Sequence, residues 1–314
     1  MDIKAEIQKL AKEIGISKIG FTTADNFDYL EKSLRASVEE GRNSGFEHKV
    51  IEDRIYPERL LESAKTIISI GVAYPHKLPQ QPQKTPYKRG KITPNSWGLD
   101  YHYVVGEKLD RLSKGIEELC RDFPLQQKAM VDTGALVDTA LIGDGSMNAK
   151  RCLSFQTQDK GMMDIEFRKK IKTVIYGCDI CQICCPYNKG INNPLATEID
   201  PELAQPELIP FLSLSNGQFK EKFGMIAGSW RGKNILQRNA IIALANAHDK
   251  TAVVKLIEII DKNNNPIHTA TAIWALGEIV KKPNDEILEF MSNLTLKDED
   301  SRKELELIRH KWQF

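Results

Sequence analysis

The 314-residue chain has no apolar run long enough to cross a bilayer, and its first residues show no apolar signal region. The start instead spaces Ile3, Ile7, Leu10 and Ile14 along one face of an amphipathic helix. The formal net charge is only +1, so the overall charge does not select a class of partner. We therefore expect a cytoplasmic protein without a membrane partner. A monomer is also expected, and with 41% apolar residues the chain is expected to form two or three domains.

Cysteine is scarce, with six residues in the chain, yet four of the six lie in the single run 178–186, CDICQICCP. Thiols of a cytoplasmic protein stay reduced, so this density indicates a metal or redox site before it indicates disulfides. Bacterial iron–sulfur motifs also end in Cys-Pro. A protein with two clusters needs a second such run, and upstream the chain offers only Cys120 and Cys152.

Four thiolates, enough for one 4Fe-4S cluster, are supplied by Cys152, Cys178, Cys181 and Cys185. Tetrahedral zinc also accepts four thiolates, and thiols without a metal are a third interpretation, although the Cys-Pro ending favours iron. Cys184 either replaces Cys185 as a ligand or is a bystander. Cys120 ends a predicted helix face and is expected to be a small buried hydrophobic residue.

Residues 1–140 have the pattern of an α/β domain. Short apolar or β-branched runs at 18–22, 66–73 and 129–132 are bounded by turn residues, as buried strands are. A helix is predicted between the last two from apolar residues at intervals of four and three, namely Val105, Leu109, Leu112, Ile116 and Leu119. The proline-containing stretch 75–98 is long enough to be a binding loop.

Asp132 stands at the carboxyl end of the third predicted strand, where ligands of open α/β sheets gather. It is therefore a candidate for contact with a substrate, although an aspartate that caps the turn is an equally simple interpretation. His102, just before the predicted helix, is ambiguous in the same way and is expected to be structural.

A proline-rich stretch at 194–210 precedes an all-helical segment that repeats itself. The sequence AIIALA at 240–245 recurs 32 residues later as AIWALG at 272–277, and a further step of that length reaches the last predicted helix near Leu307. Helix pairs with such a period stack into a solenoid of the HEAT type.

One basic segment contains the cysteine run and a second follows it. Residues 150–190 contain eight basic and four acidic side chains, and residues 217–238 contain five basic residues against Glu221 alone. The five are Lys220, Lys222, Arg231, Lys233 and Arg238. Such local density suits a polyanion such as RNA, whereas a solvated mixed surface is the alternative.

Over most of its length the chain resembles the epoxyqueuosine reductases, cobalamin-dependent iron–sulfur enzymes of the last step of queuosine synthesis in tRNA. The order and spacing of short motifs carry the resemblance: KIGFTTA at 18–24, SGF at 44–46, IEDR at 51–54, AKTIISI at 64–70, WGLDYH at 97–102, VDTG at 131–134, NAKRCLSF at 148–155, residues 177–186, FKEKFG at 219–224 and GSWRGK at 228–233.

The resemblance implies three domains. These are an incomplete α/β cobalamin-binding-like and substrate domain at 1–140, a remnant ferredoxin-like iron–sulfur module at 141–192, and a HEAT-like α-solenoid that binds tRNA at 193–314. It also implies that low-valent cobalt attacks or reduces the epoxide of the modified nucleoside, while an external donor supplies electrons through 4Fe-4S clusters.

The resemblance assigns roles to single residues. Asp132 matches the acid that protonates the departing oxygen, and it also belongs to the cobalamin pocket with Arg54, Thr93 and Ser154. The basic residues of 217–238 match part of the tRNA-binding region.

The chain departs from the family pattern after Asp138. Family members continue through a Gly-rich cobalamin segment and a first cysteine motif, whereas here residues 139–145 lead straight to Arg151 and Cys152, so roughly seventy residues are missing. One of the family's two clusters is therefore expected to be lost, and the other must use Cys185 or Cys184. Thr139 and Pro94 also stand where arginines are common in the family.

Loss of part of a parallel sheet would expose apolar edges. The alternatives to an active reductase are a tRNA-binding protein without turnover and, third, a zinc-stabilised helical-repeat module.

Overall fold

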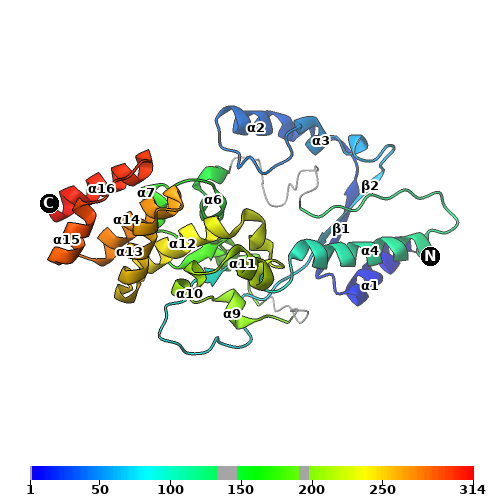
Figure 1. Ribbon diagram of the computed structural model, residues 1–314. Helices are drawn as coiled ribbons and strands as arrows, with labels where there is room; N and C mark the ends of the chain where they lie inside the picture. The colour runs from blue at the N-terminus through cyan, green and yellow to red at the C-terminus, as the bar shows by residue number, and fades with distance from the viewer. Residues whose placement is uncertain (1, 133–146, 191–197) are drawn as a thin grey trace. The chain divides into compact units, whose positions relative to one another are not determined.

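The computed structural model describes residues 2–132, 147–190 and 198–314, shown as ribbons in Figure 1. The chain divides into two compact units: residues 1–76, 99–152 and 190–197 belong to the first, and residues 77–98, 153–189 and 198–314 to the second. The cysteine run and the helical segment, which the sequence treats as separate domains, thus lie in one unit. No helix in the described ranges is long and apolar enough to span a membrane.

Two amphipathic helices pack against each other in the first unit, α1 (Ile3–Ile14) and α4 (Tyr101–Leu119). Helix α1 begins at Asp2, whose carboxylate accepts a hydrogen bond from the N–H of Ala5, and it ends at Gly15 in the left-handed conformation. Their shared core is formed by Ile7, Ala11, Ile14, Ile16, Leu112 and Ile116. Both predicted helices are confirmed, and Cys120 packs partly buried against this core, as its assignment as a small hydrophobic residue requires.

Strands β1 (Lys18–Thr23) and β2 (Thr66–Gly71) form an antiparallel pair in which Lys18 lies opposite Gly71. The predicted strands exist, but the expectation that they are buried members of a parallel sheet is wrong. Ile19, Phe21, Ile68 and Ile70 are only partly buried against the α1–α4 core, because a two-stranded sheet has one covered face. Residues 129–132 form no strand, since they have no neighbouring strand within the described ranges.

The rest of the first unit is a small helical layer. Helices α2 (Asp28–Glu39) and α3 (Ile51–Ile55) pack through Leu30, Leu34 and Ile55. Helix α3 places Arg54 in a buried position.

The second unit has a continuous core from Ile92 to Ile308. The predicted long loop contains the short strand β3 (Lys91–Ile92), which pairs in parallel with β4 (Val174–Tyr176), and helix α12 packs against β4. Around this pair lie short helices: α6 (Leu153–Gln158), α7 (Ile165–Arg168), α8 (Ile180–Cys184), α9 (Pro201–Ala204), α10 (Leu208–Leu212) and α11 (Asn216–Phe223).

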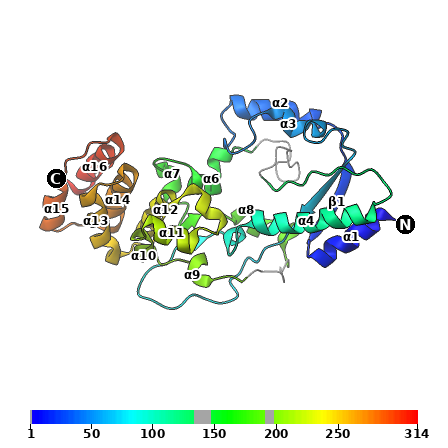
Figure 2. The same ribbon diagram turned by 45° about the vertical axis from the view of Figure 1, so that its right-hand side comes forward.

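Five further helices complete the second unit, as Figures 1 and 2 show: α12 (Lys233–Asn246), α13 (Val253–Lys262), α14 (Pro266–Ile279), α15 (Asp285–Ser292) and α16 (Glu299–Trp312). Helix α14 packs against α12, α13 and α16. The two repeated hexapeptides lie in α12 and α14 and are buried throughout. The sequence repeat therefore corresponds to alternate helices of one stack, with α13 between them in the chain.

Candidate functional site

The cysteine run leaves the buried strand β4 through a tight turn. Gly177 follows Tyr176 in the left-handed region with φ +75°, and Cys178 comes next. Helix α8 contains Cys181 and Cys184, both exposed, and Cys185 ends it. All six cysteines lie in the described part of the chain, and none of them forms a disulfide.

The donor chemistry of this run suits a metal. Four thiols within eight residues are the ligand type and spacing of iron–sulfur and zinc sites. In the described ranges, however, no three His, Cys, Asp or Glu side chains converge on one point. Cys152 is the last residue of its segment in the first unit, whereas Cys178, Cys181 and Cys185 belong to the second.

Thr93 holds the start of the cysteine run in place. Its hydroxyl donates to Oδ1 of Asp179 over 2.9 Å, and its backbone N–H donates to the carbonyl of Tyr176 over 3.0 Å. A Cβ atom at Gly177 would lie 2.1 Å from Cγ2 of Thr93, so no larger residue fits at 177 while Thr93 stays in place. The structure thus places Thr93, which the resemblance assigned to a cofactor pocket, directly against the cysteine run.

Asn239 and Thr157 support the same run from behind. The N–H of Gly177 donates to Oγ1 of Thr157 over 2.8 Å. Nδ2 of Asn239 donates to the carbonyls of Thr157 and Ile175, over 2.7 and 2.8 Å. Sequence reasoning did not identify these two residues, because a hydrogen bond between α12 and β4 leaves no local pattern.

The prediction that Arg238 contacts RNA at the surface is wrong. Its side chain is 1% exposed and donates to three backbone carbonyls around the end of α6, those of Gln156, Asp159 and Gly161. Burial lowers the pKa of Arg238 to about 10, so the guanidinium is charged at neutral pH. Local charge density in the sequence cannot reveal that these carbonyls need a donor.

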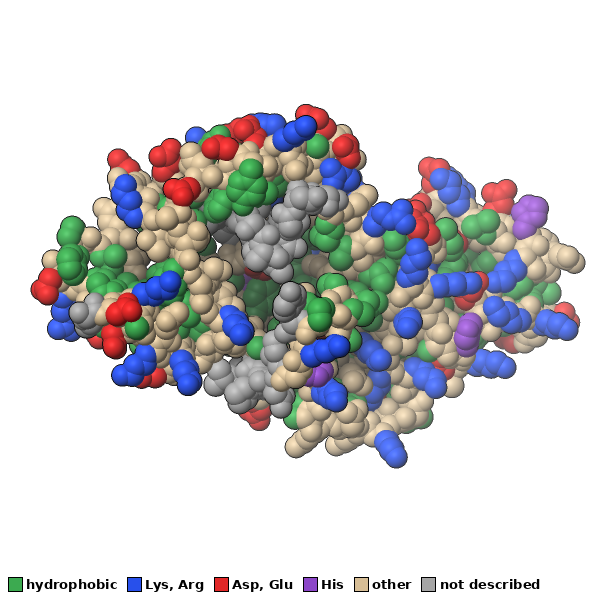
Figure 3. Space-filling view, turned by 180° about the vertical axis from the view of Figure 1, so that it is seen from behind, with side chains coloured by type: hydrophobic (Ala, Val, Ile, Leu, Met, Phe, Trp, Pro, Cys, Tyr) green, Lys and Arg blue, Asp and Glu red, His purple; other side chains and the backbone are tan. Residues whose placement is uncertain are grey.

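The other four basic residues reach the surface to different extents. Lys220 and Lys222 are exposed on α11, whereas Arg231 and Lys233 are partly buried, and Nζ of Lys233 donates to the carbonyl of Leu214 over 3.1 Å. Figure 3 shows many Lys and Arg side chains on the face of the second unit that it presents. Segment 217–238 therefore has accessible cations even though Arg238 is buried.

Asp132 lies in the first unit, in a turn, with a side chain that is 56% exposed. The Tyr101 hydroxyl donates to its Oδ2. Nε2 of His102 lies 2.9 Å from Oδ1 of Asp132, and Nδ1 of the same ring lies 2.8 Å from Oδ1 of Asp100. Both ring nitrogens can donate at once only when the ring is protonated, so His102 links two carboxylates and is able to carry a proton between them.

His102 and Tyr101 are thus side-chain partners of Asp132. Sequence reasoning did not predict that these residues contact one another. Their rings are stacked with centroids 4.3 Å apart. The clue in the sequence is their position at the start of α4, directly after the α4 N-cap Asp100, whose carboxylate accepts from the N–H of His102.

Arg54 in the first unit is 8% exposed, and within the described residues its guanidinium forms no hydrogen bond or ion pair. Burial lowers its pKa, and the charge of Glu47 opposes that effect. Ser154 lies on α6 in the second unit, where its hydroxyl accepts from Nε2 of Gln158 over 3.2 Å. Thr139 and the place after Asp138 where the family's internal segment is expected to be missing lie in 133–146, outside the described residues.

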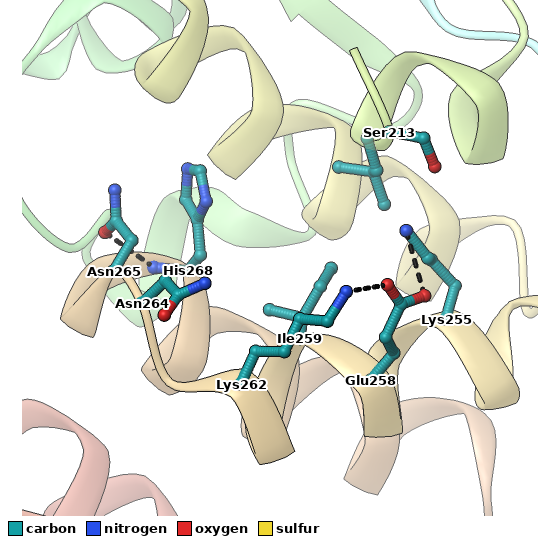
Figure 4. Close-up of a pocket in the computed structure, with 9 residues that line it drawn as sticks. Ser213, Lys255, Glu258, Ile259, Lys262, Asn264, Asn265 and His268 are labelled. Atoms are coloured by element: carbon teal, nitrogen blue, oxygen red, sulfur yellow. Dashed lines mark hydrogen bonds and ion pairs between the residues drawn. The ribbon is translucent and has the colours of Figure 1, made fainter. Parts of the chain in front are cut away.

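The helical stack also contains an open cavity of about 430 Å³ that sequence reasoning did not anticipate (Figure 4). On one side Glu258 accepts from Lys262 over 2.7 Å and from Lys255 over 3.0 Å, which lowers its pKa to about 2. On the other side Nε2 of His268 donates to the carbonyl of Asn234 over 2.8 Å. Both lysines that line the cavity, Lys255 and Lys262, are already paired with the carboxylate of Glu258. The lining therefore does not indicate a class of ligand.

Comparison with known protein families matches the greater part of the first unit and the cysteine run. Residues 54–133 match the family described as "Epoxyqueuosine reductase QueG, DUF1730", and residues 134–188 match the "4Fe-4S double cluster binding domain". The chain is 45% identical to an epoxyqueuosine reductase of Lactococcus garvieae, covering 89% of this chain and 97% of that protein. It is 39% identical to the enzyme of Bacillus subtilis, covering 97% and 94%.

Solved structures agree along the whole chain. An epoxyqueuosine reductase from Streptococcus thermophilus superposes with a TM-score of 0.94 at 64% identity, covering 100% of both chains. An epoxyqueuosine reductase crystallised with a tRNA-Tyr epoxyqueuosine-modified stem loop superposes with a TM-score of 0.87 at 37% identity, covering 99% of both. A Bacillus subtilis structure, described with its aspartate catalytic loop swung out of the active site, gives 0.83 at 36% identity.

The alignments to the curated relatives are longer than the chain itself. The alignment to the Bacillus subtilis protein extends over 367 residues, although this chain has 314 in total. The excess consists of positions that this chain lacks, which agrees with the predicted absence of an internal segment.

Proposed function

This chain belongs to the epoxyqueuosine reductase family, and from that membership we propose that it reduces epoxyqueuosine to queuosine in a tRNA anticodon loop. The observation that carries the proposal is the agreement along the whole chain with solved epoxyqueuosine reductases, one of which holds a modified tRNA stem loop. Loss of the epoxide oxygen as water consumes two electrons and two protons. The chain must therefore supply an electron path and a proton donor.

Asp132 is the proton donor in this proposal. Its carboxyl group passes a proton to the departing oxygen, and its exposed side chain can reach a substrate. The Tyr101 hydroxyl and the His102 ring orient the two carboxylate oxygens. Because His102 also contacts Asp100, it is able to return a proton to Asp132 after each turnover.

Cobalamin is the proposed reducing cofactor, held by Arg54, Thr93, Asp132 and Ser154. When bound, it supplies a low-valent metal centre that reduces the epoxide. The position of Arg54 supports this assignment. Its side chain is 8% exposed and, within the described residues, forms no hydrogen bond or ion pair, although the charge of Glu47 acts on it. An anionic group of a cofactor would give this partly desolvated cation a direct partner.

One 4Fe-4S cluster is proposed for this chain, held by Cys178, Cys181 and Cys185 together with Cys152, with Cys184 as the alternative to Cys185. Two clusters require eight thiolates, but the segment 134–188 that matches a double-cluster domain contains five cysteines. An external donor supplies its electrons.

The helical stack is proposed to be a HEAT-like solenoid that binds the tRNA beside Lys220, Lys222, Arg231 and Lys233. Stacked helices α12 to α16 and the exposed lysines of α11 support this assignment. We propose a monomeric cytoplasmic enzyme with three functional parts at 1–140, 141–192 and 193–314, although the cysteine run of the second part shares one compact unit with the helical stack of the third.

Anaerobic reconstitution with iron, sulfide and cobalamin tests these assignments, followed by an assay for queuosine in tRNA. We expect about four irons per chain and measurable turnover. Asp132→Asn is expected to keep iron and tRNA binding and to lower turnover by at least ~100-fold, because it removes the acid. About eight irons per chain would contradict the single cluster, and unchanged turnover in Asp132→Asn would exclude Asp132 as the acid.

A tRNA-binding protein without turnover is the second candidate. It is supported by the positions of the Bacillus subtilis enzyme that have no counterpart in this chain, since catalytic parts could be among them. In that case the reconstituted protein shows the broad visible absorption of a cluster but no co-eluting corrin band, and it still binds tRNA. Zinc without visible absorption would instead indicate the zinc-stabilised module.

A further inference from the structure

Trp230 is an exposed tryptophan with fixed surroundings. Its relative exposure is 55%, whereas that of Trp274, in the helical stack, is 6%. It lies in the short 3-10 helix Ala227–Arg231, between the exposed lysines of α11 and the buried helix α12. Single exposed aromatic side chains are common, and Tyr103 and Phe123 are each 63% exposed, so the role of Trp230 has to be argued from its neighbours.

The edge of the indole ring is anchored to the strand that leads into the cysteine run. Nε1 of Trp230 donates to the hydroxyl of Tyr176 over 3.2 Å, and Tyr176 is 7% exposed. Gly228 packs against the ring of Tyr176, since a Cβ at position 228 would lie 2.9 Å from Cγ of Tyr176. The hydrogen bond to the buried Tyr176 uses the edge of the indole, and 55% of the Trp230 surface is exposed to solvent.

Arg231 lies over one face of the indole. Its guanidinium carbon lies 4.5 Å from the centroid of the Trp230 ring, and its Nε donates to the carbonyl of Gln158 over 2.5 Å. Aromatic rings and arginine planes are the surfaces on which proteins stack unpaired nucleobases, and the positive charge attracts the adjoining phosphates.

We propose that Trp230, with Arg231 stacked over one face of its ring, is a stacking platform for an unpaired base of the tRNA anticodon loop. The proposal rests on the proposed function, because it takes tRNA as the substrate. A base stacked here lies against Trp230, whose indole donates to Tyr176. Tyr176 in turn stands two residues before Cys178 in the chain. The platform therefore selects RNA with an unpaired loop, which the phosphate contacts of Lys220 and Lys222 cannot do.

The test is equilibrium binding of the full-length protein to two RNAs, an anticodon stem–loop and a fully paired duplex with the same number of phosphates, over a range of salt concentrations. We expect Trp230→Ala to weaken stem–loop binding roughly 5- to 150-fold, as loss of one base stack does, and to leave duplex binding unchanged. The slope of log K against log salt is expected to stay constant, because no charge is removed. Trp230→Phe keeps a stacking face and is expected to retain most of the affinity.

Met225→Ala is the matched control, because Met225 is 58% exposed nearby in sequence but has no aromatic face. Thermal unfolding of each variant establishes that it is folded. If the wild type binds the stem–loop and Trp230→Ala binds it equally well, the platform is excluded while the proposed function stands. If the wild type binds neither RNA, both fail.

Discussion

Gly177 shows how one residue governs the cysteine run. Its φ of +75° is unfavourable for residues with a side chain, and a Cβ would also collide with Thr93 at 2.1 Å. Gly161 has a similar φ of +82° with no atom within 4 Å of a Cβ. A substitution at Gly161 therefore introduces backbone strain alone, whereas one at Gly177 introduces both strain and a collision with Thr93.

Gly177→Ala is expected to lower the free energy of unfolding by about 2–4 kcal/mol, because backbone strain and overpacking add. It is also expected to reduce the iron bound after reconstitution, since Cys178 is displaced. Gly161→Ala is expected to cost about 1 kcal/mol and to keep its iron. Denaturant unfolding and iron analysis measure both, and equal losses in the two variants would contradict the role given to Thr93.

Arg238 is a buried residue whose charge serves the fold. Arg238→Met is expected to lower the free energy of unfolding by roughly 3 kcal/mol or more, because each buried carbonyl left without a donor costs about 1–3 kcal/mol. Lys220→Met, at an exposed site, is expected to change it by less than ~0.5 kcal/mol. Urea unfolding distinguishes them, and a stable Arg238→Met protein with weakened RNA binding would restore the surface assignment.

At the scale of elements, the repeat in α12 and α14 explains the continuous core. The small residues Ala240, Ala243, Ala272 and Ala275 let these helices approach closely, and all four have no exposed surface. A helix that is apolar on every side must be covered on every side, which is why α14 contacts α12, α13 and α16.

The start of α14 gives the stack a pH dependence. Burial lowers the pKa of His268, with smaller contributions from the charges of Lys233 and Arg238. The unfolded chain therefore takes up a proton near pH 6.5 that the folded chain does not, so stability is full above this pH and falls as the pH decreases below it.

His268→Gln is expected to make stability depend less on pH below 6.5, because the uncharged amide can still donate to Asn234 and binds no proton in either state. Urea unfolding at pH 7.5 and 5.5 measures the change. A pH dependence as steep as that of the wild type would show that other groups cause it.

At the scale of the whole molecule, the accessible cations set the salt dependence of RNA binding. Lys222→Ala is expected to reduce the magnitude of the slope of log K against log salt by up to ~1, because one phosphate contact is lost. Lys12→Ala, on the exposed face of α1, is the control and is expected to leave the slope unchanged. Equal slopes in the wild type and both variants would exclude α11 from the RNA surface.

The sequence by itself determined the local features: the amphipathic helices around Ile7 and Leu112, the repeat in α12 and α14, the cysteine run and the family. These are encoded by periodicity and spacing within short segments. Only the tertiary structure decided that strands β1 and β2 pair antiparallel, that Arg238 is buried, that Thr93 anchors the cysteine run and that His102 contacts Asp132. Each of these depends on residues far apart in the chain or on unpaired backbone groups, and burial and hydrogen-bond satisfaction are settled only when the segments pack.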